Sequence, residues 1–305
     1  MLKLGIDKTE GRKVTQSILS KSVAIRGIET DAIRELVAAA TFKALSCGQF
    51  SVPDVLLAKV PVLNWFTKHN LLAVSYHKHI NSKRPSSEYL DEAVHVASKM
   101  IVGYQDLADL VAVDGSDNIS TPEFIFKYRR PPTHAIVEGR VVPVFGIVAI
   151  LAVAKLVADT DCLGGGFSNA GFVVRRDALG MPLSVRAVKI DTGFSFNFRG
   201  SENIYTQSFT PFQHGHKMKD RRDIQFGNNQ TFEIEFEHLL PAQKEVFMRT
   251  FKHGVRRLDR KLIAALIWQD NAFNIDKIRV KQVEVDQAAE EWLSYLCQLA
   301  KTYDK

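Results

Sequence analysis

Apolar residues recur at helical spacing between residues 31 and 46, in the segment DAIRELVAAATFKALS. An apolar residue at every third or fourth position is typical of an α-helix with one buried face. We therefore predict an amphipathic helix here that ends near Gly48. Its buried face is predicted to comprise Ile33, Leu36, Val37, Ala40, Phe42 and Leu45.

Runs rich in β-branched residues flank this helix and predict strands. They lie at 22–26 (SVAIR), 50–60 (FSVPDVLLAKV) and 94–103 (VHVASKMIVG), with Pro53 marking an edge position or a turn into the second run. The segment YQDLADLVAV, which follows the third run, is predicted to start a helix.

The middle of the chain combines a polar stretch with a long apolar run. Residues 114–140 contain Gly, Ser, Asn, Thr and three Pro, so they are predicted to form a connecting excursion. Residues 141–154 (VVPVFGIVAILAVA) are uncharged, but the run is shorter than the about 20 residues that cross a bilayer. We expect no transmembrane segment, and instead a helix over 141–158 that is buried on all sides.

The remaining pattern predicts a hairpin and then helices. Residues 171–175 (GFVVR) and 185–190 (VRAVKI) read as two strands joined across a turn at 177–182. Amphipathic helices are predicted at 241–254, 256–270 and 287–303. A small sheet-bearing N-terminal part followed by a helix-rich half predicts an α+β chain.

Composition adds limits on compartment and partners. The chain has 305 residues, 46% hydrophobic and 24% charged, with 40 basic against 34 acidic side chains. The basic excess gathers at 217–222 and 252–261, which suits phosphate groups, although such runs more often only face water. We do not expect a nucleic-acid partner, because no RNA-binding, zinc-finger or helix-turn-helix signature accompanies the charge. Cys47, Cys162 and Cys297 lack CxxC spacing and no export signal is visible, so we expect a reducing cytosol.

A polar loop crowded with Asp, Gly and Asn connects the apolar run to the hairpin. It reads DTDCLGGGFSNAGFVV (159–174), and the hairpin ends in VKIDTGFSF. A P-loop would need Lys at Phe172, and a dinucleotide loop would need Gly at Asn169. Both motifs also open a helix, whereas this loop continues as a strand. We therefore set both aside.

Two Asp and one Asn in this order fit phosphoryl transfer. That chemistry needs one carboxylate to position the nucleophile, and an Asn and an Asp to hold Mg²⁺ against a triphosphate. Here Asp161 and Asn169 share one loop, and Asp191 ends the second hairpin strand. The arrangement resembles the protein-kinase-like superfamily, in which Asp191-Thr192-Gly193 would stand for Asp-Phe-Gly. It is most similar to the atypical branch: phosphatidylinositol 3- and 4-kinases, actin-fragmin kinase, HipA-like kinases and kinase-like effectors of intracellular bacteria.

The resemblance implies a bilobal kinase-like fold, with an N-lobe at 1–104 and a C-lobe at 105–305. Val23–Arg26 stands where the family has Val-Ala-Ile-Lys, so Arg26 would stabilise the ATP phosphates and pair with Glu35. Met100 and Ile101 would lie in the hinge that receives adenine. Asn169 and Asp191 would bind Mg²⁺ or Mn²⁺.

The resemblance also implies the reaction and its setting. Asp161 would act as the catalytic carboxylate toward a protein or phosphoinositide hydroxyl. An anionic activator or lipid would fit the basic patches. The protein would work in the cytosol, or in a host cytosol or at a membrane surface if it is a delivered effector.

Several features depart from the family and keep alternatives open. Seven residues separate Asp161 from Asn169, whereas kinases have four, and a tight turn at Gly164–Gly166 would absorb the difference. Arg26 replaces the phosphate-binding Lys, so either Arg26 does its work or Lys21 or Lys13 reaches into the site instead. A pseudokinase that only binds nucleotide or phosphoinositide is the further alternative. Asp159 competes with Asp161 as the base, or it braces the loop.

Individually, the other residues have simpler explanations. Asn169 alone could hold a left-handed turn, and Asp191 alone could end a strand. Glu35 could be a surface charge, and Met100 and Ile101 could be core residues.

Overall fold

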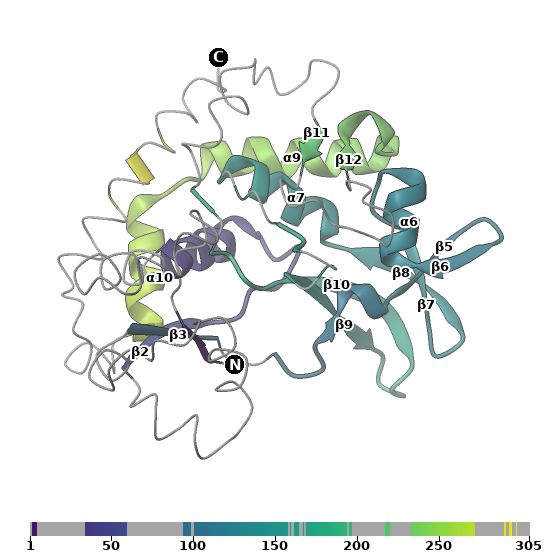
Figure 1. Ribbon diagram of the computed structural model, residues 1–305, viewed down its shortest axis with the longest axis horizontal. Helices are drawn as coiled ribbons and strands as arrows, with labels where there is room; N and C mark the ends of the chain where they lie inside the picture. Colours follow the sequence, from purple (N-terminus) through teal and green to yellow (C-terminus); the bar gives the residue numbers. More distant parts are fainter. Residues whose placement is uncertain are drawn as a thin grey trace, which may run out of the picture.

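The computed structural model combines helices with two main sheets (Figure 1). It describes residues 2–4, 34–59, 94–98, 101–157, 159, 162–164, 167, 169–193, 195–196, 217–219, 233–271, 290, 293–294 and 297. The mixed α+β content agrees with the sequence pattern. Predictions for residues 22–26 and most of 287–303 lie outside the described residues.

A three-stranded antiparallel sheet forms early in the chain. It has the order β1-β3-β2, from β1 (Leu2–Leu4), β2 (Val55–Lys59) and β3 (Val94–Ser98). The predicted amphipathic helix is present over residues 34–45. Every described member of its predicted apolar face is at most 6% exposed, while Ile33 lies outside the described residues.

A seven-stranded sheet has the order β4-β9-β10-β8-β7-β5-β6. Its strands are β4 (Gln105–Asp106), β5 (Val111–Asp114), β6 (Asp117–Ser120), β7 (His134–Val137), β8 (Arg140–Phe145), β9 (Ala170–Arg176) and β10 (Pro182–Lys189). The predicted hairpin is confirmed, because β9 and β10 pair antiparallel from Arg176↔Pro182 to Ala170↔Lys189. At its turn, Asp177 Oδ1 accepts hydrogen bonds from the backbone N–H groups of Leu179 and Met181.

Helices cover the sheets and form the core. All ten residues of α7 (Ile147–Leu156) are buried, and α7 packs between β10 and α9 (Pro241–Arg256). α10 (Arg260–Asn271) lies beside the helix at 34–45 and β2 (Figure 1). Shorter elements are η2 (Leu107–Asp109), α6 (Thr121–Tyr128), β11 (Lys217–Lys219), β12 (Glu233–Glu235) and η5 (Phe236–His238). Within the described part of the chain, no helix is long and apolar enough to cross a membrane.

Three sequence predictions in the middle of the chain are wrong. The helix predicted after residue 104 is instead β4, one 3₁₀ turn and β5. The predicted excursion at 114–140 is structured, because Ser120 and Glu123 form a capping box that starts α6. The apolar run at 141–158 is divided into β8 and the shorter α7, since a short apolar run does not distinguish a buried strand from a buried helix.

Gly146 marks this division between strand and helix. Its φ of +95° lies in the left-handed region, and an added Cβ would be 2.7 Å from the carbonyl oxygen of Gln49. Only glycine satisfies both conditions without strain. The chain therefore changes direction here, and α7 begins at the next residue.

Lys155 is a charged residue in the otherwise apolar α7. Its side chain is 9% exposed, and burial lowers the pKa of its ammonium to about 8. Because this folded-state pKa lies below the ordinary value of 10.5, the charged form costs stability below pH 8, and the cost fades as the pH rises towards 10.5.

We therefore expect Lys155→Met to stabilise the fold by roughly 2–3 kcal/mol at pH 7. Urea unfolding of the wild type and the variant between pH 6 and pH 9.5 measures this effect, and the gain should shrink above pH 8. Lys261→Met, at an exposed position of α10, is the control and should change stability by less than about 0.5 kcal/mol. A gain that does not change with pH would contradict the assignment.

Candidate functional site

The ladder between β9 and β10 brings Asn169 and Asp191 to the same end of the hairpin. The last ladder pair is Ala170↔Lys189, and beyond it the N–H of Ile190 donates to the carbonyl oxygen of Asn169 at 3.1 Å. Asp191 is therefore one residue past the direct partner of Asn169. Asn169 is 6% exposed and Asp191 is partly exposed, so this end of the hairpin combines a buried amide with a more accessible carboxylate.

The loop before β9 is folded tightly around Asn169. The N–H of Asn169 donates to Leu163 O at 2.9 Å, and the N–H of Phe167 donates to Gly164 O at 3.1 Å. Gly164 has φ +80°, and an added Cβ would lie 2.6 Å from Asn169 Cγ. The predicted glycine turn is thus confirmed at Gly164, whereas Gly165 and Gly166 lie outside the described residues.

Asp191-Thr192-Gly193 connects the hairpin to the helix at 34–45. Asp191 has φ 46°, an uncommon conformation for a residue with a side chain, and its Oδ1 accepts from the N–H of Gly193 at 3.4 Å. The Thr192 hydroxyl donates to the carbonyl oxygen of Glu35 at 3.0 Å.

The same segment also closes against the end of α7. The N–H of Phe196 donates to Val157 O at 2.7 Å, and the N–H of Ser195 donates to Thr192 O at 3.1 Å. Thr192 and Ser195 are at most 2% exposed. The helix at 34–45, the loop after α7 and the end of the hairpin therefore meet at one place.

A buried ion pair, which the sequence analysis missed, lies at the centre of this meeting point. Lys189 Nζ is 3.1 Å from Asp159 Oδ2, and both side chains are 0% exposed. Burial is the largest single influence and lowers the pKa of the Lys189 ammonium, but Asp159, Cys162 and Asp191 together outweigh it, so the pKa is raised overall. Strand alternation was the available signal, because Lys189 follows the buried Val185 and Ala187 at every second position.

Asp159 therefore braces the loop. The N–H of Asp159 donates to Ala154 O at 2.8 Å, and its carboxylate contacts Lys189. With its side chain fully enclosed, Asp159 has no open path to a substrate hydroxyl. Of the two alternatives for this residue, the bracing role is the one that its surroundings match.

The other candidate residues are only partly described. Glu35 is 5% exposed, which excludes a solvent-facing charge. Ile101 is half-buried after β3, and its carbonyl oxygen accepts from the N–H of Tyr104 at 3.1 Å. Arg26, Met100 and Asp161 lie outside the described residues, so the Arg26–Glu35 pair, the hinge and the catalytic carboxylate remain predictions.

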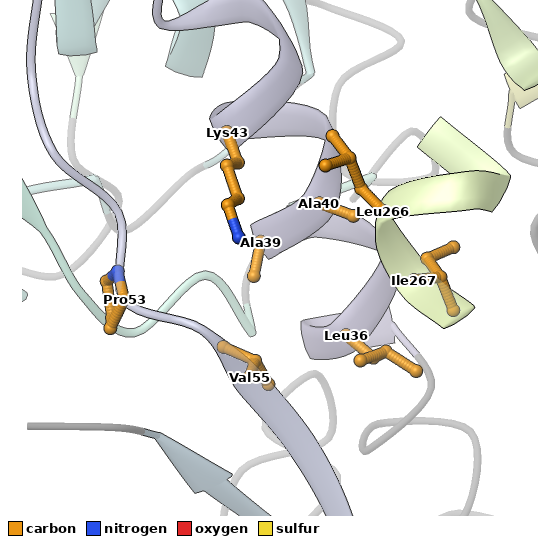
Figure 2. A pocket seen from close by; sticks show the side chains of 8 residues that line it. All are labelled: Leu36, Ala39, Ala40, Lys43, Pro53, Val55, Leu266 and Ile267. Atoms are coloured by element: carbon orange, nitrogen blue, oxygen red, sulfur yellow. The ribbon is translucent and has the colours of Figure 1, made fainter. Parts of the chain in front are cut away.

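A separate hollow lies between the helix at 34–45, β2 and α10 (Figure 2). Its volume is about 10 Å³, which is the space of one water molecule. Leu36, Ala39 and Ile267 are among its lining residues, and Lys43 reaches Asp54 at 2.6 Å beside it. This hollow is too small and too apolar for a nucleotide.

The hairpin end carries two side chains of the types that bind hard divalent cations in proteins. A carboxylate and an amide oxygen suit Mg²⁺ or Mn²⁺, which commonly take further oxygens from phosphates and water. Within the described parts of the chain, no three His, Cys, Asp or Glu side chains lie close enough together to hold a metal ion by themselves. A cation here would therefore depend on phosphate oxygens as well as on Asn169 and Asp191.

Comparisons with known proteins give no family assignment. No protein-family model matches the chain, and neither a curated protein nor a solved structure matches it.

Proposed function

We propose that this chain is an ATP- and divalent-metal-dependent phosphotransferase that acts on a hydroxyl acceptor in a protein or a phosphoinositide. One observation carries the proposal: the β9–β10 ladder places Asn169 and Asp191 at one end of the hairpin, beside the loop that contains Asp161. An amide, a carboxylate and a neighbouring carboxylate are side chains that kinase-type sites use for phosphoryl transfer.

Each residue has a distinct role in the proposed reaction. Asn169 and Asp191 hold Mg²⁺ or Mn²⁺, which offsets the negative charge on the ATP phosphates. Asp161 orients the acceptor hydroxyl and takes its proton as the new O–P bond forms, while the bond from the γ-phosphorus to the β–γ bridging oxygen breaks and ADP leaves. Arg26, paired with Glu35, stabilises the α- and β-phosphates, and Met100 and Ile101 contact adenine.

The order of the elements supports a kinase-like, bilobal arrangement. A helix at 34–45, the antiparallel strands β2 and β3 and a linker at 101–104 come first, and after β4–β8 and α6 they are followed by the buried α7, a polar loop and a hairpin. The hydrogen bond from Thr192 to Glu35 O connects the metal-binding segment to the helix that carries the proposed ion-pairing Glu. We infer an N-lobe at 1–104 and a C-lobe at 105–305.

The basic C-terminal surface supports an anionic partner for this enzyme. Arg256, Arg257 and Lys261 are exposed where α9 ends and α10 begins. We propose that an acidic activator or an anionic lipid binds there, in the cytosol or at a membrane surface. Nucleic acid is not proposed, because the charge has no accompanying base-reading motif.

Transfer of label from γ-labelled ATP tests the proposed function. The wild-type chain is incubated with Mn²⁺ or Mg²⁺ and with mixed protein and phosphoinositide acceptors, and a chelator serves as the control. Metal-dependent transfer is the expected result. Metal-dependent binding of ATP without transfer would favour a pseudokinase, and the absence of both would overturn the proposal.

A further inference from the structure

We infer that Lys189 is a positioning residue that fixes the metal-binding and catalytic segments relative to each other. This inference rests on the proposed function. Lys189 is the last residue of β10, two positions before Asp191, and its side chain is 0% exposed. Its ammonium is enclosed, so it acts on nucleotide or metal only through the groups that it holds.

The ammonium contacts two residues of the loop after α7 and one residue of the segment that follows β10. Lys189 Nζ donates to Cys162 O at 2.7 Å and to Asp191 O at 2.9 Å, and it lies 3.1 Å from Asp159 Oδ2. Two of its N–H groups therefore donate to backbone carbonyl oxygens, and the Asp159 carboxylate pairs with its charge. It also lies 5.6 Å from the centre of the Phe42 ring, on the helix at 34–45.

Each contact restrains a neighbour of a proposed functional residue. Cys162 directly follows Asp161 in the sequence, and Asp159 lies two residues before it. The carbonyl oxygen of Asp191 belongs to the residue whose carboxylate would bind the cation. One buried group therefore sets the distance between the catalytic loop and the metal-binding segment.

A buried ion pair contributes little net free energy to the stability of a fold. Removing two charges from water costs about as much as their attraction returns, and a well-packed apolar pair is often equally stable. The loss of only one partner is far more damaging, because it leaves an uncompensated buried charge. Stability and positioning can therefore be separated by replacing both partners together.

The test compares single and paired replacements. Lys189→Met and Asp159→Leu are made singly and together, and Lys189→Gln is combined with Asp159→Asn as a polar pair. Thermal unfolding reports the fold. Affinity for Mn²⁺ with a fluorescent, non-hydrolysable ATP analogue reports the site, and transfer from γ-labelled ATP gives kcat and KM.

We expect both single variants to unfold at a lower temperature and the apolar pair to recover most of the loss. The apolar pair should still bind the Mn²⁺–nucleotide about 10- to 100-fold more weakly, which is the usual effect of losing a group that orients a metal ligand. Its kcat should fall more than its KM rises, because the catalytic loop also loses a tether. The polar pair, with fewer donors, should lose less affinity than the apolar pair.

A matched control is available at the other end of the same hairpin. Arg176 Nη2 lies 2.6 Å from Glu138 Oε1 in an exposed ion pair. The paired variant Arg176→Met and Glu138→Leu should leave nucleotide affinity and kcat unchanged.

Three results would overturn this inference. The first is an apolar pair that regains both the stability and the Mn²⁺–nucleotide affinity of the wild type, since Lys189 would then only support the fold. The second is failure of both paired variants to fold, because Lys189 would then be a folding requirement. The third is a wild-type chain that binds no Mn²⁺–nucleotide, and this result alone would also remove the proposed function.

Discussion

Gly164→Ala is expected to weaken Mn²⁺-dependent nucleotide binding at least about 100-fold. The new Cβ would lie 2.6 Å from Asn169 Cγ and 2.8 Å from the backbone nitrogen of Asn169. Rotation of the Asn169 side chain cannot relieve the backbone contact, so the whole residue must move away from Leu163, whose carbonyl oxygen accepts its N–H. An effect of this size is expected when a metal ligand itself is displaced, since loss of only a supporting group costs about 10- to 100-fold.

Gly180→Ala is the matched control for this prediction. Gly180 has φ +79°, nearly the same as the +80° of Gly164, but an added Cβ at Gly180 has nothing within 4 Å. Both variants thus carry a similar backbone strain of about 1–2 kcal/mol, and only one of them displaces Asn169. Titration with Mn²⁺ and a fluorescent ATP analogue compares them, and equal affinities for the two variants would contradict the placement of Asn169 in the site.

Asp191→Asn and Asp161→Asn are expected to affect different steps. Asn tolerates the left-handed conformation of Asp191 and can still accept the N–H of Gly193, so the fold should survive while the cation loses its charged ligand. Mn²⁺-dependent nucleotide binding should therefore fall at least about 100-fold. Asp161→Asn should retain that binding and lose transfer by about 10²- to 10⁴-fold, which is the usual contribution of a general base.

Asp177→Asn provides a control at the opposite end of the hairpin. Asp177 accepts two backbone N–H groups in the turn, as a structural Asp does, and the ladder separates it from the proposed site. This variant should transfer phosphate at the wild-type rate. If Asp191→Asn and Asp161→Asn both turn over ATP like Asp177→Asn, the assignment of the site residues is wrong.

The sequence predicted the elements in which the spacing of apolar residues and the turn residues at both ends agree. The helix at 34–45 has a clear apolar face, and the β9–β10 hairpin has two alternating strands around a polar turn. The apolar run after residue 140 was predicted less well, because strand and helix give the same signal when every residue is buried. The glycine at position 146 was a sequence indication of a break in this run. In the structure its φ is +95°, a conformation that favours glycine.

The candidate site could be predicted from the sequence only through the chemistry of its residue types and their spacing. The spacing of Asn169 and Asp191 around a hairpin predicted that they lie near each other, and the ladder places them at one end of it. The ion pair between Lys189 and Asp159 was missed, because it joins residues that are far apart in sequence, and the strand pattern predicts a buried position for Lys189 but no partner. Such long-range pairing is decided by packing, which local pattern does not record.

The most direct measurement is a crystal structure with Mn²⁺ and a non-hydrolysable ATP analogue, in which anomalous scattering locates the metal. The account predicts a metal peak within about 2.3 Å of Asn169 Oδ1 and of the Asp191 carboxylate, with phosphate oxygens completing its coordination. A nucleotide and metal bound elsewhere on the chain, or Asn169 and Asp191 side chains that bind no common ion, would contradict it.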